Sequence, residues 1–252
     1  MKEIFKTHKK LVSIFFTAGY PKLNSTTSTL LELQKNGVDF VEIGVPFSDP
    51  MADGETIQES SKIALENEMT LKLLFSQLEE VKNEVNIPII LMGYFNSLLQ
   101  YGIKEFCKKA KEVGVSGVIF PDLPLEIYNR DYKSIFEEYG ISVVFLISPQ
   151  TSKERIIEID KATTTFIYAV SSTSSTGKAG SEINTSYLKS LNEMNLCSPI
   201  MVGFGIKDQD TFNDATQFSN GGIIGSAFIK HLATSKPISE FTNIFKQKTL
   251  TI

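Results

Sequence analysis

Eight short apolar runs, separated by segments with helical spacing, are the feature that most constrains the fold of this chain. The runs are rich in β-branched and other apolar residues, and they cover residues 11–17, 40–44, 87–94, 117–120, 142–147, 165–170, 199–204 and 221–225. Strands that are apolar on both faces are typical of parallel sheets whose outer face is covered by helices. The pattern therefore predicts an α/β protein made of eight strand–helix units.

The segments between these runs predict amphipathic helices. Residues 28–37 and 106–114 carry apolar side chains three and four positions apart, and the segments end at Gly37 and Gly114. A glycine is common directly after a helix because it adopts the left-handed conformation at low cost. Eight such units can close into a barrel, whereas an open doubly wound sheet has the same local pattern and is the structural alternative.

The chain is expected to form one domain. It has 252 residues, and no linker rich in Pro, Gly or Ser divides it, so we predict that residues 1–252 form a single domain, either a (β/α)₈ TIM barrel or an open doubly wound sheet. The Ser- and Thr-rich stretch 171–182 directly follows a predicted strand. A mobile loop over a site explains this stretch better than a linker does.

Charge and cysteine content exclude several classes of partner. The formal net charge is −4 at pH 7, the pI is near 5.4, and Lys and Arg are scattered among the acids, so we expect no nucleic-acid partner. No apolar segment is long enough to cross a membrane, and no membrane partner is expected. Cys107 and Cys197 belong to no paired-cysteine motif, which favours a reducing, cytoplasmic location over a disulfide framework or a zinc site.

Two carboxylates near the second apolar run are candidate catalytic residues. Glu42 lies inside the run 40–44, and Asp53 follows eleven positions later in a loop of Pro, Ser, Asp and Gly. In a barrel, both can point into the mouth, where a buried carboxylate with a raised pKa exchanges protons and an ionised one holds an N–H donor. The alternatives are that a cation pairs with Glu42 and that Asp49 and Asp53 cap the helix that begins at Glu55.

Glycines at the ends of the last two strands predict a phosphate site. The seventh and eighth runs are followed by Gly205 and Gly225, and Ser226 can begin a helix. Backbone N–H groups at such positions bind an anion without any lysine or arginine, which suits an acidic protein with a phosphorylated ligand. Tight turns without a ligand are the alternative explanation for these glycines.

Other catalytic mechanisms lack the residues they need. His8 and His231 are far apart in the sequence, so neither a histidine metal cluster nor a Ser/His triad is indicated. No predicted strand contains the lysine that a Schiff-base aldolase requires. Aromatic residues at or near strand ends either hold a flat apolar ligand or pack in the core, and these are Phe15, Tyr94, Tyr168 and Phe204.

The stretch VEIGVPFSDPMADG at 41–54 resembles the signature of the tryptophan synthase α subunit family. Further stretches match in the family's order over nearly the whole chain, namely FFTAGYP (15–21), LMGYFN (91–96), YGIKEF (101–106), GVIFPDLPLEI (117–127), FIYAVSSTSSTG (166–177), VGFGI (202–206) and GSAFIK (225–230). The resemblance implies a single (β/α)₈ barrel and a carbon–carbon lyase. It would cleave indole-3-glycerol phosphate to indole and glyceraldehyde 3-phosphate in a retro-aldol reaction without a cofactor.

The resemblance also implies roles for individual residues. Glu42 matches the general acid/base, and Asp53 matches the acid that holds the indole N–H. The positions that match residues around the indole and glycerol portions are Phe15, Ile57, Tyr94, Tyr168 and Phe204. The positions that match the phosphate cradle are Gly177, Gly205, Gly225 and Ser226. Thr176 matches a lid threonine that approaches the catalytic aspartate on closure.

A partner is implied in the same way. The family's α subunit passes indole through a tunnel to a β subunit that carries pyridoxal phosphate, in an αββα heterotetramer. Three positions match residues in loops that face this partner, and they are Pro46, Asp49 and Asn96. The chain departs from many relatives in the lid, at Ser172, Ser174 and Ser175. Two other functions stay open on the residues alone: a noncatalytic barrel that binds a phosphorylated ligand, and a related barrel that acts on another phosphorylated metabolite.

Overall fold

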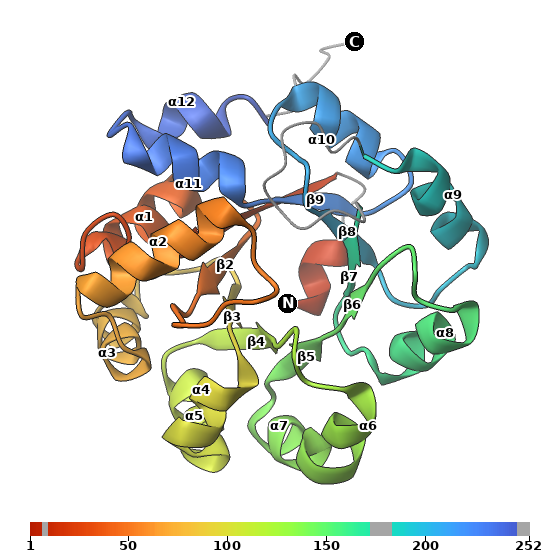
Figure 1. Ribbon diagram of the computed structural model, residues 1–252, viewed down its shortest axis with the longest axis horizontal. Helices are drawn as coiled ribbons and strands as arrows, with labels where there is room; N and C mark the ends of the chain where they lie inside the picture. Colours follow the sequence, from red (N-terminus) through yellow and green to blue (C-terminus); the bar gives the residue numbers. More distant parts are fainter. Residues whose placement is uncertain (7–9, 172–182, 246–252) are drawn as a thin grey trace.

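The computed structural model describes residues 1–6, 10–171 and 183–245. Figure 1 looks along a ring of strands with helices around its outside. The strands are β1 (Leu11–Thr17), β2 (Phe40–Gly44), β3 (Ile89–Met92), β4 (Val115–Ile119), β5 (Ser142–Val144), β6 (Leu146–Ile147), β7 (Ile167–Val170), β8 (Ile200–Gly203) and β9 (Gly221–Ile224). Every predicted apolar run overlaps a strand, and β4 begins two residues before its predicted run, so the prediction of strands at these places is confirmed.

The outer layer consists of helices of 3 to 12 residues. They are α1 (Ser25–Lys35), α2 (Glu55–Glu66), α3 (Leu71–Val81), α4 (Phe95–Tyr101), α5 (Ile103–Glu112), α6 (Leu125–Ile127), α7 (Lys133–Tyr139), α8 (Lys153–Ala162), α9 (Thr185–Glu193), α10 (Gln209–Thr216), α11 (Ser226–Ala233) and α12 (Ile238–Thr242). Gly37 and Gly114 follow α1 and α5 with φ angles of +78° and +82°, as helix-ending glycines do. Among the described helices, none has the length and apolar content to cross a bilayer.

The strands form a nearly closed parallel barrel, not an open doubly wound sheet. The strand order is β5-β4-β3-β2-β1-β9-β8-β7-β6, and all pairs are parallel. The two terminal strands of this order are separated in the chain by Phe145 alone, whose carbonyl accepts a hydrogen bond of 3.0 Å from the Tyr168 N–H. The predicted run 142–147 is therefore one strand interrupted at its middle, and the eight-stranded (β/α)₈ prediction is confirmed.

Side chains inside the barrel form a separate core from those under the helices. The inner core consists of Leu11, Phe40, Ile90, Ile119, Val144, Phe166, Tyr168, Met201 and Ile223. On β2, Val41 and Ile43 pack outward against the helices, so alternation along the strand points Phe40 and Glu42 inward. A glutamate thus occupies a position where the neighbouring strands supply apolar side chains.

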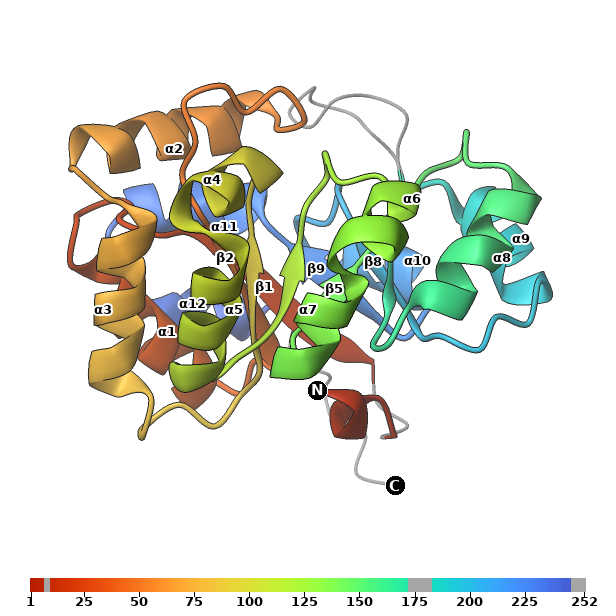
Figure 2. The ribbon, with the colours of Figure 1, turned by 90° about the horizontal axis from the view of Figure 1, so that it is seen from below.

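The lower end of the barrel is covered by the N-terminus. The 3₁₀-helix η1 (Lys2–Lys6) brings Met1, Ile4 and Phe5 against the inner core, with the Phe5 and Phe166 ring centroids 5.7 Å apart. Figure 2 shows η1 below the strands, on the side away from α2 and α4. The site has to be sought at the upper end, where the strands point their carboxyl termini.

Candidate active site

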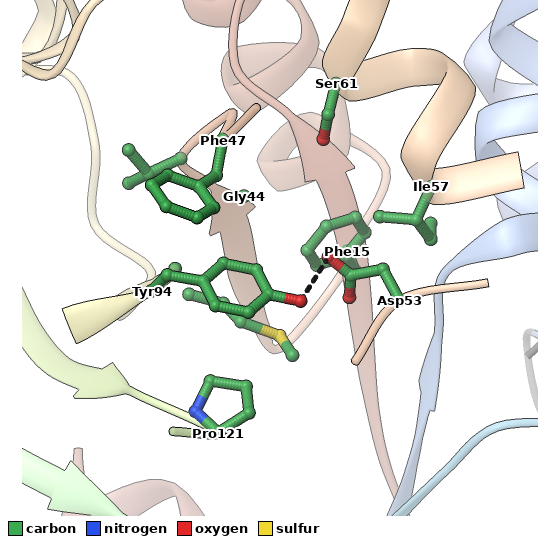
Figure 3. A pocket seen from close by; sticks show the side chains of 11 residues that line it. Phe15, Gly44, Phe47, Asp53, Ile57, Ser61, Tyr94 and Pro121 are labelled. Atoms are coloured by element: carbon green, nitrogen blue, oxygen red, sulfur yellow. Dashed lines mark hydrogen bonds between the residues drawn. The ribbon is translucent and has the colours of Figure 1, made fainter. Parts of the chain in front are cut away.

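A pocket lies at the carboxyl ends of β1, β2 and β3. Its walls come from the strand ends and from the loop and helix that follow β2, as Figure 3 shows. The lining residues are Phe15, Gly44, Val45, Phe47, Asp53, Ile57, Ser61, Met92, Gly93, Tyr94 and Pro121. Most of these side chains are apolar or aromatic and Asp53 is the one ionisable carboxylate among them, which is the composition of a site for a flat apolar ligand with one polar group.

Glu42 is fully buried on β2, between Phe15 of β1 and Ile90 of β3 in the strand register. Neither carboxylate oxygen has a hydrogen-bond partner in the described part of the chain. Loss of hydration disfavours the charged form, so burial raises the pKa of Glu42 to about 8. The alternative that a cation neutralises this side chain is wrong for the residues that the structure describes.

Asp53 lies in the loop before α2 and points into the pocket. Burial raises its pKa to about 6, and a hydrogen bond from Tyr94 acts in the opposite direction. The Tyr94 hydroxyl donates to Asp53 Oδ2 at 3.4 Å and accepts from the Ala52 N–H at 2.8 Å. The N-cap of α2 is Gly54, without a side-chain capping bond, so the alternative that Asp53 caps this helix is wrong. The Gln58 amide further fixes the loop by donating to the Asp53 carbonyl at 2.8 Å.

Tyr168 is close enough to Glu42 and Asp53 to feel their charges, and it also contacts Gly203 and Phe204 at the end of β8. Its side chain is buried, and burial followed by the charges of Glu42 and Asp53 raises the pKa of the phenol well above its usual value. The hydroxyl lies over Gly203, where a Cβ would come within 2.0 Å of Tyr168 Oη. The ring meets Phe204 edge to face at a centroid distance of 6.0 Å. Only glycine at position 203 leaves room for this arrangement.

The two glycines predicted to bind phosphate lie just after two adjacent strands, β8 and β9. Gly205 follows β8 with a φ of +83°, and Gly225 is the N-cap of α11, which begins at Ser226. No side chain caps α11, so its first N–H groups are available to an anion. A Cβ on Gly225 would be 3.6 Å from Phe15 Cβ, which puts this helix start beside the aromatic pocket.

The strand order brings the predicted site residues together. Glu42 on β2, Phe15 on β1, Gly225 after β9 and Gly205 after β8 follow one another around one end of the barrel. Ile57 lines the pocket from α2. Thr176, Gly177 and the three lid serines 172, 174 and 175 lie outside the described residues. Within the described ranges, no group of three or more His, Cys, Asp or Glu side chains is arranged to hold a metal ion.

The three residues expected to face a partner have different environments. Asp49 and Asn96 are exposed, with Asn96 on α4 rather than in a loop, whereas Pro46 is buried within the chain. Phe47 and Pro121 are pocket residues that the sequence analysis did not single out. Pro121 directly follows the predicted strand 117–120, and Phe47 lies three positions after the predicted strand 40–44. The ring of Phe47 stacks on Tyr94 at a centroid distance of 4.9 Å. Position after a strand was therefore the signal that could have found them.

Comparison with known proteins gives one consistent family. The family model for the tryptophan synthase alpha chain matches residues 1–249. The chain is 55% identical over 239 residues to the tryptophan synthase alpha chain of Flavobacterium psychrophilum, which covers 93% of this chain and 94% of that protein. It is 52% identical over 244 residues to the alpha chain of Christiangramia forsetii, which covers 96% of this chain and 95% of that protein.

Solved structures agree with this result. A chain of Mycobacterium tuberculosis tryptophan synthase superposes with a TM-score of 0.88 at 25% identity, covering 96% of this chain and 95% of that one. A mutant tryptophan synthase alpha-subunit from Pyrococcus furiosus superposes with a TM-score of 0.82 at 31% identity, covering 93% and 97%. In both cases the similarity covers more than nine-tenths of each chain.

Proposed function

This chain belongs to the tryptophan synthase alpha chain family, which cleaves indole-3-glycerol phosphate and passes indole to a beta subunit, and we propose that Glu42 and Asp53 carry out the cleavage. The activity is that of a carbon–carbon lyase without a cofactor of its own, since the pyridoxal phosphate of this enzyme lies in the beta subunit. The observation that supports our assignment best is the fully buried, unpartnered carboxyl group of Glu42. A fold gains nothing in stability from such a group.

Glu42 supplies and recovers a proton. With its pKa raised to about 8, the carboxyl group is mostly protonated at pH 7 and can give its proton to indole C3. The bond between C3 and the hydroxyl-bearing glycerol carbon then breaks, and its electron pair returns to the indole ring. The Glu42 carboxylate takes the proton of the glycerol hydroxyl, which becomes the aldehyde oxygen of glyceraldehyde 3-phosphate. The side chain ends the cycle protonated, as it began.

Asp53 stabilises the indole ring while it is protonated at C3. Protonation at C3 puts positive charge on the indole nitrogen, and a carboxylate that accepts the N–H bond lowers the energy of that charge. The pKa of about 6 leaves Asp53 mainly ionised at pH 7. Phe15, Ile57 and Tyr94 form the walls around the ring, and Tyr168 and Phe204 complete the glycerol side.

The phosphate is held by backbone groups. Gly205, Gly225 and Ser226 offer N–H groups at the ends of β8 and β9, and family resemblance assigns Gly177 to the same cradle. The same resemblance assigns Thr176 to a lid that approaches Asp53 on closure. Loops after the last two barrel strands are the common phosphate site of this fold. The dipole of α11 adds a favourable field for the dianion.

We further propose that residues 1–252 form one catalytic domain and that two copies join two beta subunits in an αββα heterotetramer. Asp49 and Asn96 are exposed near the pocket mouth, where such a partner would receive indole. Met51, with 89% of its surface exposed, belongs to the same loop as Asp49. Cys107 and Cys197 are free thiols, which agrees with a cytoplasmic location.

Glu42→Gln tests the assignment. We expect release of indole from indole-3-glycerol phosphate to fall by about 10²- to 10⁴-fold because the proton donor is lost while the shape is kept. The matched control is Glu55→Gln, an exposed residue in the first turn of α2, which should keep wild-type turnover. Melting curves of both variants are recorded with the rates. Unchanged turnover in Glu42→Gln would refute the role, and absence of indole from the wild type would favour a noncatalytic barrel.

A further inference from the structure

The turn after β8 has an unusual backbone. Phe204 and Gly205 follow each other with φ angles of +70° and +83°, both in the left-handed region. Glycine adopts this region freely, whereas a bulky residue such as phenylalanine does so only where its surroundings hold it there. The neighbours of Phe204 must therefore fix this conformation.

Ser171 holds the backbone of this turn. It directly follows β7 and is completely buried. Its hydroxyl donates to the Phe204 carbonyl at 2.6 Å and lies 3.1 Å from the Gly203 carbonyl oxygen. Its backbone N–H also donates to Gly203 O at 3.2 Å. One residue, directly after the neighbouring strand β7, thus satisfies two successive carbonyl groups of the turn.

Tyr168 holds the same turn from its side-chain face. Its hydroxyl occupies the space over Gly203, and its ring meets the Phe204 ring edge to face. The Phe204 ring packs against Tyr168 and the Phe204 carbonyl accepts from Ser171, so the peptide between Phe204 and Gly205 is held from the Phe204 side by two contacts. The orientation of the Gly205 N–H follows from this peptide plane.

We propose that Ser171 is a positioning residue for the phosphate end of the site, acting through the Phe204–Gly205 turn. Its hydroxyl fixes the turn in the conformation in which the Gly205 N–H faces the phosphate of the ligand. This inference rests on the proposed phosphate role of Gly205. Loss of the hydroxyl lets the turn relax from the left-handed conformation, and the phosphate loses a preorganised donor.

The reverse reaction separates this role from a general loss of structure, because indole and glyceraldehyde 3-phosphate are then separate substrates. For Ser171→Ala we expect the KM for glyceraldehyde 3-phosphate to rise about 10-fold. We expect the KM for indole to change by less than about 2-fold, because Phe15, Ile57 and Tyr94 lie on other elements. Equal changes in both KM values, or no change in either, would overturn the proposal.

Ser219→Ala is the matched control. Ser219 is also buried, and its hydroxyl also lies within hydrogen-bond distance of two backbone carbonyls, those of Ala215 and Gly221, at 2.8 and 3.2 Å. It precedes β9 at the opposite end of the barrel. We expect Ser219→Ala to lower the melting temperature about as much as Ser171→Ala does and to leave both KM values at the wild-type level.

A second pair covers the case in which Ser171→Ala does not fold. Ser171→Thr and Ser171→Val have the same shape, and only threonine keeps the hydroxyl. The Ser171→Thr variant should bind glyceraldehyde 3-phosphate about 10-fold more tightly than the Ser171→Val variant. Equal affinity of the two variants would contradict the proposal. Calorimetric titration with glycerol 3-phosphate applies the same comparison without turnover, so a wild type that makes no indole would refute the proposed function and still leave this inference testable.

Discussion

At the scale of single residues, Glu42 shows how a site opposes the stability of its own fold. Its carboxyl group is buried inside the barrel without a hydrogen-bond partner among the described residues. An unpaired buried charge is among the most costly features that a protein can contain, and the group avoids the cost by staying protonated. The same shift suits Glu42 to the proton donation that we propose, so in this role the destabilising environment would also produce the chemistry.

The stability of the protein should therefore depend on pH through Glu42. Its pKa is about 8 in the folded chain against 4.5 for an ordinary glutamate, so its favourable contribution is fully present below about pH 4.5 and is lost as the pH rises through about 8. Glu42→Gln removes this dependence. By urea unfolding, we expect the variant to be more stable than wild type by about 2 to 4 kcal/mol at pH 9 and equal within about 1 kcal/mol at pH 4.5. A variant that is less stable at pH 9 would show that the glutamate has a stabilising partner.

The rate of cleavage should depend on pH through both acids. Asp53 must be ionised and Glu42 protonated, so kcat/KM should rise through about pH 6 and fall through about pH 8. Tyr94 and Tyr168 face the same space, but burial raises the pKa of Tyr94 to about 12 and that of Tyr168 well above its usual value, so neither titrates in this range. Initial rates of indole release at constant ionic strength measure the profile.

Asp53→Asn is the control for the acidic limb. The phosphate group of the substrate also titrates near pH 6, so part of that limb belongs to the ligand. In Asp53→Asn, only the phosphate contribution should remain, at a kcat lowered by about 10²-fold because the charge that stabilises the indole nitrogen is gone. An acidic limb identical to that of the wild type would assign it wholly to the substrate.

At the scale of elements, hydrogen bonds fix the helices next to the site. The Ser60 hydroxyl on α2 lies 2.7 Å from the Thr17 hydroxyl at the end of β1, and it donates to the Ile57 carbonyl at 2.8 Å. On the other side of the site, Asp208 caps α10 by accepting from the Thr211 N–H at 2.9 Å, and the two residues form a reciprocal capping box. The Thr211 bonds also hold the pKa of Asp208 below its usual value.

Removing this cap should affect stability more than function. Asp208→Ala is expected to lower the free energy of unfolding by about 1 kcal/mol because Thr211 N–H loses its acceptor. Asp210→Ala is the matched control, since it removes the same charge from the first turn of α10, two positions after Asp208, without removing a cap. Denaturant unfolding of the two variants measures the difference. If Asp208→Ala also raises the KM for the phosphorylated substrate about 10-fold, then α10 itself positions the Phe204–Gly205 turn.

The sequence predicted those strands and helices whose residue pattern lies within the element itself. Continuous apolar runs identified all the strands because each strand is buried on both faces. The interruption at Phe145 and the short helix α4 carry no local signal of this kind. At the site, Glu42 was recognisable because a carboxylate inside an apolar run has few structural uses. The contact of Tyr168 with Gly203 was not, because it depends on how β7 and β8 pair.

At the scale of the whole molecule, the two ends of the barrel have different tasks. Residues Met1, Ile4 and Phe5 of η1 close the lower end and enlarge the inner core. The upper end carries the buried acid, the left-handed turn at Phe204 and the exposed side chain of Met51. Features that reduce stability therefore gather where substrate and partner are expected, which is the usual separation in this type of barrel.

Exposure of Met51 leads to a prediction about the partner. This loop joins β2 to α2 and contains both Asp49 and Asp53, so a subunit that docks here would cover one side of the proposed site. Met51→Gln keeps the length of the side chain and removes its apolar character. We expect it to weaken association with a beta subunit about 10-fold, by roughly 1.4 kcal/mol, and to leave cleavage by the isolated chain within about 2-fold of wild type. Ile157→Gln on α8, also an exposed apolar residue at 44%, should change neither. Calorimetric titration with the beta subunit gives the affinities, and equal affinity of the Met51 variant and wild type would remove this loop from the interface.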